Sequence, residues 1–88
     1  MDIRYIGSAL NFGEIEDVVG SADRYREALV TLLSEQYPTA QVEVEIVTAD
    51  DRSTEVWVDG RLGTVDAGYI RDAADRLWME CCEDGRIR

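Results

Sequence analysis

Side chains that commonly perform catalysis are scarce in this sequence. It contains no histidine and therefore lacks the commonest general base and the commonest transition-metal ligand. Nineteen Asp and Glu residues remain, and a pair of carboxylates is enough for acid and base chemistry in a glycosidase. Such an enzyme also needs a concave site, for which 88 residues leave little room. We therefore expect a protein that is not an enzyme, with carboxylate catalysis as the least favoured alternative.

Three short motifs match known binding or redox sites only in part. Residues 50–55 offer oxygen ligands but lack the alternating acidic positions and the glycine of a calcium loop. Residues 60–63 lack the spacing of a phosphate-binding loop. Cys81 and Cys82 are adjacent, which makes a disulfide between them difficult, and their acidic neighbours disfavour a reactive thiolate. We expect turns and packing residues at these positions, and no metal or cofactor.

Charge is the most pronounced property of the chain. Nine arginines, no lysine and nineteen acidic residues leave a formal net charge of -10. This charge repels nucleic acids and anionic lipid surfaces, and it attracts cationic partners over long distances. We therefore expect a basic protein partner, with no direct binding of nucleic acid and no membrane association.

Length and composition indicate one folded domain. A chain of 88 residues accommodates a single core, and an apolar fraction of 45% is typical of globular proteins. The sequence has no apolar run long enough to span a membrane and no signal-peptide pattern at its first residues. Together with the adjacent cysteines, these features predict a single acidic α/β domain over residues 1–88 with a cytoplasmic location.

Alternation and helical spacing predict the elements that position the charged side chains. Ser21 is expected to cap the first helix, and Thr64 or Asp66 the second, which Gly85 ends. The expected elements are a strand over 3–6, a loop with a helical turn over 11–20, a helix over 22–36, strands over 41–47 and 54–58, and a helix over 67–83.

The two middle strands are expected to pair as an antiparallel hairpin across a turn at 49–53. A short fourth strand is expected at residues 61–62. Two amphipathic helices then cover one face of a small mixed or antiparallel sheet of three to four strands, an α+β fold in the order β-α-β-β-α. The residues predicted to meet in the core are Val42, Val44, Ile46, Val56 and Val58 of the sheet, and Leu29, Leu32, Leu33, Ile70, Ala74 and Leu77 of the helices.

Acidic side chains are expected to gather on the face of the sheet that the helices leave uncovered, if the core valines face the helices. Alternation places Glu43, Glu45 and Glu55 on this side, with Trp57 among them. Opposed like charges are unfavourable, and an exposed aromatic within a charged rim is typical of a binding hot spot. The alternatives are an acidic surface that serves solubility and a Trp57 covered by another segment. With acids of the last helix, the candidate partner-binding residues are Glu43, Glu45, Glu55, Trp57, Asp72, Asp75 and Glu83.

In length, in its charge of -10 and in its lack of catalytic residues, the chain resembles the small acidic anti-CRISPR proteins of phages and mobile elements. Acids on adjoining surfaces, such as Glu43, Glu45, Glu55, Asp72 and Asp75, are part of the resemblance. It covers the whole chain as composition and no part of it as a motif, and it carries over no residue roles. The resemblance implies inhibition of a CRISPR effector complex by imitation of nucleic-acid charge.

The sequence thus favours a non-enzymatic inhibitor that competes with nucleic acid for a basic nucleic-acid-binding protein or complex. The alternative is a small structural or regulatory interaction module whose charge serves solubility. Such a module is expected to be a monomer, or a homodimer joined along a strand edge or an apolar helix face.

Overall fold

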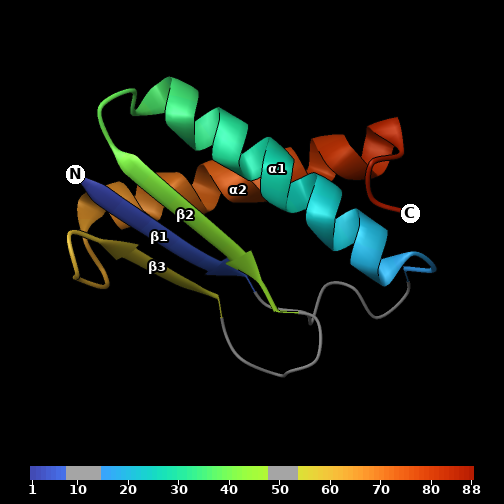
Figure 1. Cartoon of the computed structure of the whole chain (residues 1–88), viewed down its shortest axis with the longest axis horizontal. Coiled ribbons are helices and arrows are strands. Elements are labelled where there is room, and N and C mark those ends of the chain that lie inside the picture. Colours follow the sequence, from blue (N-terminus) through green and yellow to red (C-terminus); the bar gives the residue numbers. More distant parts are fainter. Residues whose placement is uncertain (8–14, 48–53) are drawn as a thin grey trace.

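The computed structural model describes residues 1–7, 15–47 and 54–88. They form β1 (Asp2–Gly7), α1 (Val18–Gln36), β2 (Gln41–Ile46), β3 (Glu55–Val58) and α2 (Val65–Asp84), as labelled in Figure 1. This order, with three strands in one mixed sheet and two helices, confirms the predicted α+β fold class. The expected turn at 49–53 and part of the expected loop at 11–20 lie outside the described residues.

β1 lies at the centre of the sheet, whose strand order is β2-β1-β3. β2 runs parallel to β1, and β3 runs antiparallel to it. The predicted hairpin between residues 41–47 and 54–58 is therefore wrong, because β1 separates the two strands. β1 is also the most buried strand, with Ile3, Tyr5 and Ile6 no more than 5% exposed. Because β1 is central, its backbone N–H and C=O groups form hydrogen bonds with a strand on each side, as buried backbone groups must.

The predicted fourth strand at residues 61–62 is also wrong. Within the described part of the chain, Arg61 forms only an isolated bridge with Val58. Gly60 and Gly63 have φ angles of 76° and 73°, in the left-handed region that glycine adopts without strain. Two left-handed residues so close together turn the chain toward α2 and leave no room for an extended segment.

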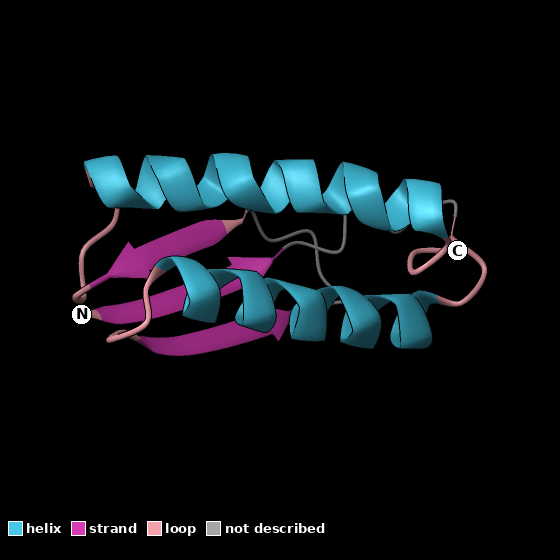
Figure 2. Cartoon of the chain, turned by 90° about the horizontal axis from the view of Figure 1, so that it is seen from above, coloured by secondary structure: helices cyan, strands magenta, loops and turns pink. Residues whose placement is uncertain are grey.

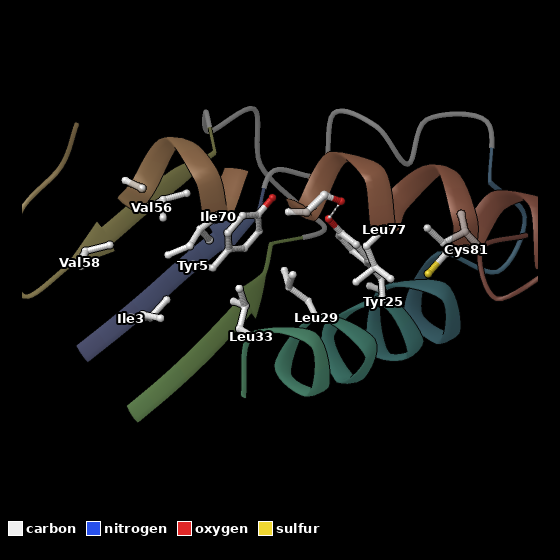
Figure 3. Close-up of a cluster of buried hydrophobic side chains, with 14 residues drawn as sticks. Ile3, Tyr5, Tyr25, Leu29, Leu33, Val56, Val58, Ile70, Leu77 and Cys81 are labelled. Atoms are coloured by element: carbon white, nitrogen blue, oxygen red, sulfur yellow. Dashed lines mark hydrogen bonds between the residues drawn. The ribbon is translucent and has the colours of Figure 1, made fainter. Parts of the chain in front are cut away.

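Both helices pack on the same face of the sheet. They run in opposite directions along the molecule, with the strands beside one half of their length (Figure 2). As Figure 3 shows, Leu33 of α1 and Ile70 of α2 lie toward the side chains of the strands, and Leu77 of α2 lies beside Tyr25 between the helices. The predicted core is confirmed, with Val42, Val44, Ile46 and Leu32 partly buried at its margin.

Aromatic side chains close the space between the helices. Tyr25 of α1 is buried, and its hydroxyl donates a hydrogen bond to the backbone oxygen of Ala74 at 2.9 Å. Trp78 packs edge-on against the Tyr25 ring, with 5.3 Å between ring centroids, and lies at the edge of the core. Cys81 is fully buried while Cys82 is exposed, so the two thiols have different environments.

Each helix begins at a polar capping residue. The Asp17 carboxylate accepts a hydrogen bond from Gly20 N and caps α1, so the prediction that Ser21 caps this helix is wrong. In α2, the Thr64 side chain accepts from Ala67 N at 3.1 Å, and Gly85 ends the helix in the left-handed conformation. Both of these α2 predictions are confirmed.

The last residues of the chain turn back onto the first turns of α1. Asp17 N donates to the backbone oxygen of Arg88 at 2.9 Å, and Arg24 Nε donates to that of Arg86 at 2.6 Å. The buried Ser21 hydroxyl bonds both the N–H and the C=O of Arg88 at 3.0 Å. Ser21 therefore holds the C-terminal segment against α1 instead of capping a helix.

Candidate functional site

The side of the sheet opposite the helices carries the predicted sheet residues. Because Ile3, Tyr5 and the core valines point toward the helices, the intervening residues point the other way. No described helix or strand packs over this side. We call it the open face, and its residues are Asp2, Arg4 and Ile6 of β1, Gln41, Glu43 and Glu45 of β2, and Glu55 and Trp57 of β3.

The structure brings Glu43, Glu45, Glu55 and Trp57 onto this face, as alternation predicted, but it does not make them neighbours. β1 lies between the two groups, so Arg4 is flanked by Glu43 on one side and Trp57 on the other. Ile6 is flanked in the same way by Glu45 and Glu55, and it is only 5% exposed. Sequence reasoning missed Arg4, whose position on the face follows from alternation with Ile3 and Tyr5.

The central strand changes the electrostatics of the face. Glu45 and Glu55 are separated by two strand spacings, about 9.5 Å between backbones, so the penalty for directly opposed like charges does not apply to them. Arg4 Nε lies 4.0 Å from Glu43 Oε2, and both side chains are largely exposed, an ion pair of little energetic weight in water. The four acidic residues of the open face and Arg4 together give this face a net charge of about -3 at neutral pH.

An aromatic ring and a depression mark the end of the open face near Asp2. Trp57 is half-buried and borders a shallow depression of about 370 Å³, lined also by Asp2, Arg4, Glu43 and the turn at Gly60. The carboxylate of Asp59 accepts a hydrogen bond from Asp2 N at 2.8 Å, which fixes this turn beside β1. The depression therefore combines an apolar ring with carboxylates and one guanidinium.

The acids of α2 lie elsewhere. Asp72, Asp75 and Glu83 are exposed on a helix that covers the other face of the sheet. The structure therefore does not join them to the open face, and the predicted set divides into a sheet group and a helix group. Tyr69 and Met79, which are 64% and 61% exposed, also lie on α2.

Among the described residues, Cys81 and Tyr25 are buried ionisable groups. No three described His, Cys, Asp or Glu side chains gather closely enough to hold a metal ion. Burial raises the pKa of the Cys81 thiol, and burial with the adjacent Tyr5 raises the pKa of the Tyr25 hydroxyl, so these groups stay protonated at neutral pH. In the part of the chain that the structure describes, no helix is both long enough and apolar enough to cross a membrane.

Comparison with known proteins adds no relative to this description. No protein-family model matches the chain, and no curated protein matches it either.

Proposed function

We propose that the protein is a non-enzymatic inhibitor that binds a basic, nucleic-acid-binding protein or complex through the open face and competes with nucleic acid for it. The observation that carries the proposal is the open face, over which no described helix or strand packs and which carries Glu43, Glu45 and Glu55 together with Arg4 and Trp57. A CRISPR effector is the partner that the resemblance in size and charge implies.

Charge supports the proposal both through long-range attraction and through direct contacts. The net charge of -10 draws a cationic partner toward the molecule from a distance and loses strength as salt is added. At contact, the carboxylates of the open face meet lysine or arginine side chains, and such complementarity favours fast association and a defined orientation. Both effects fall steeply with ionic strength, which is also the behaviour of nucleic-acid binding.

The spacing of carboxylates along a strand of the open face is compatible with the spacing of phosphates in a nucleic-acid backbone. Residues two positions apart in a strand are about 6.8 Å apart, roughly twice the spacing of successive phosphates along one DNA strand. Glu43 and Glu45 follow this repeat on β2. Trp57 supplies apolar contact at the border of the depression, where a partner's side chain is shielded from water.

Two charge-matched variants test this assignment. E43Q/E45Q/E55Q changes the open face, D72N/D75N/E83Q changes α2, and each raises the net charge from -10 to -7. Immobilised wild type and both variants are incubated with a nuclease-treated bacterial lysate, washed with low and then high salt, and eluted for mass spectrometry. We expect the wild type and the α2 variant to retain a nucleic-acid-binding protein that added DNA displaces, and the sheet variant to retain about tenfold less.

Equal losses in the two variants would show that only overall charge matters and would overturn the assignment of the open face. Recovery of the protein alone, with a mass in solution that rises with concentration, would overturn the inhibitor and establish the self-associating module instead. Analytical ultracentrifugation of the purified wild type provides this second readout.

A further inference from the structure

The two edges of the sheet differ in whether their backbone groups are paired. At the β3 edge, Val58 N donates to Arg61 O at 3.0 Å and Arg61 N donates to Val58 O at 3.1 Å. Arg71 of α2 also donates to the backbone oxygen of Thr54 at 3.0 Å, just before the strand. The turn and α2 therefore block much of this short edge.

None of the described residues pairs with the outer edge of β2. Gln41 N donates to Met1 O at 2.9 Å and Val47 N donates to Gly7 O at 3.0 Å, so the odd-numbered residues of this segment face β1. The even-numbered residues Val42, Val44 and Ile46 direct their N–H and C=O groups away from the sheet. Within residues 1–7, 15–47 and 54–88, these groups have no hydrogen-bond partner. Such an edge is a template for an added strand.

The surroundings of this edge favour an added strand whose two rows of side chains differ in chemical character. On the helix side, a hollow of about 230 Å³ lies between α1 and the strand, lined by Val19, Ala22, Asp23, Arg26 and Ile46. Val19 is 78% exposed at this hollow. On the open face, Glu43 and Glu45 extend from the same edge strand. An added strand would place one row of side chains beside apolar groups and the other row beside carboxylates.

Charge disfavours a second copy of this chain as the occupant. If two β2 strands pair antiparallel about Val44, Glu43 of each copy lies opposite Glu45 of the other. Moving the register by two residues places Glu43 opposite Glu43, or Glu45 opposite Glu45. Like charges in directly opposed positions destabilise a sheet, and the net charge of -10 on each copy adds to the repulsion. The edge is complementary to a strand of positive charge.

We propose that the β2 edge binds an extended basic segment of another protein as a fourth strand of the sheet. Lysine or arginine at alternate positions of the segment lies beside Glu43 and Glu45, and the apolar residues between them extend the row of Val42, Val44 and Ile46. Main-chain hydrogen bonds hold the segment, and the alternating side chains select it. The inference deepens the proposed function, on which it rests, because it specifies how a basic partner engages the glutamates of β2.

The probe is a seven-residue peptide of alternating valine and arginine, capped at both ends, with a control peptide that carries the same residues as one arginine block and one valine block. Binding to the isotope-labelled wild-type protein is followed by NMR. We expect amide hydrogen exchange at Val42, Val44 and Ile46 to slow at least about tenfold with the alternating peptide, and to change little with the block peptide. Val44→Pro removes one outward N–H and should weaken the binding of the alternating peptide at least about tenfold.

Backbone methylation of the peptide tests the proposal without altering the protein. In a strand, successive N–H groups point to opposite edges, so methylating either the valine or the arginine nitrogens removes only one set of donors. We expect one methylated peptide to lose binding and the other to keep it. An antiparallel strand would need the valine N–H groups, and a parallel strand would need those of arginine.

Equal effects of the two methylations, or unchanged exchange at Val42, Val44 and Ile46 in the bound state, would overturn strand addition. If the peptide then perturbs only Arg4 and Trp57, the open face still binds basic groups and the proposed function stands. Protection of the edge amides without peptide, together with a dimeric mass, would overturn the basic segment as occupant. Strand addition that persists while the lysate experiment recovers no nucleic-acid-binding protein would overturn the proposed inhibitor alone.

Discussion

Replacing Ser21 by alanine tests the attachment of the C-terminal segment to α1. The Ser21 side chain is fully buried, and its hydroxyl both donates to and accepts from the backbone of Arg88. Each neutral hydrogen bond contributes about 1 kcal/mol, and a polar group left without a partner away from water adds to the loss. We therefore expect Ser21→Ala to lower the free energy of unfolding by about 2 kcal/mol. For a domain of this size, that corresponds to a fall in Tm of roughly 8 to 16 °C.

Urea denaturation followed by far-UV circular dichroism measures this loss. Ser34→Ala is the matched control, because Ser34 is exposed on the same helix and the same substitution raises helix propensity by a few tenths of a kcal/mol at both positions. A difference between the two variants below about 0.5 kcal/mol, which is the lower limit for one hydrogen bond, would refute the reasoning. It would mean that the C-terminal segment does not depend on the buried hydroxyl.

Three further changes test other local interactions. Gly85→Ala should lower the free energy of unfolding by about 1 kcal/mol in chemical denaturation, because the φ of 85° disfavours a Cβ; an unchanged midpoint would contradict this cap. The Arg24 side chain and Gly20 N–H hold the pKa of Asp17 below its usual range, so the stability it adds is complete above about pH 4 and is lost as the pH falls through the lowered pKa. Asp17→Asn should remove this part of the acid dependence below about pH 4, and identical pH profiles of stability would argue against it. Glu43→Pro should lower Tm well below that of Val44→Pro, because only the first removes an N–H directed at β1; equal melting temperatures would contradict the β2 register.

The elements of the fold were predictable because each has a strong local signal. Alternation of valine and glutamate identified β2 and the face that it buries, and periodic leucines identified α1. Pairing of the strands was not predictable in the same way. Two alternating segments separated by a short polar stretch have the same appearance whether they pair directly or flank a third strand. The burial of Ile3 and Tyr5, which makes β1 central, is a property of the tertiary structure.

The start of α1 shows the same limit. Asp17 and Ser21 are both good capping residues, and the β-branched Val18 and Val19 with Gly20 weaken the helical signal between them. The choice between the two is made by contacts distant in sequence, because Ser21 is engaged by Arg88. The candidate site follows a similar pattern. Alternation predicted which side chains share the open face, but the place of Arg4 among them depended on the strand order.

The central position of β1 has a consequence for how the chain folds. Asp2 pairs with Gln41 and Ile6 with Glu55, so all of α1 separates β1 from its first partner, and β2 does not pair with β3, the strand that follows it among the described residues. Sheets built from distant pairings fold more slowly than hairpins of similar size, since a large loop must close before any pairing energy is gained. During synthesis β1 emerges before both partners, and Ile3, Tyr5 and Ile6 stay exposed until β2 and β3 follow. Residues 1–58 contain twelve acidic residues and four arginines, and the resulting net charge of -8 opposes association between incomplete chains while the central strand is unpaired.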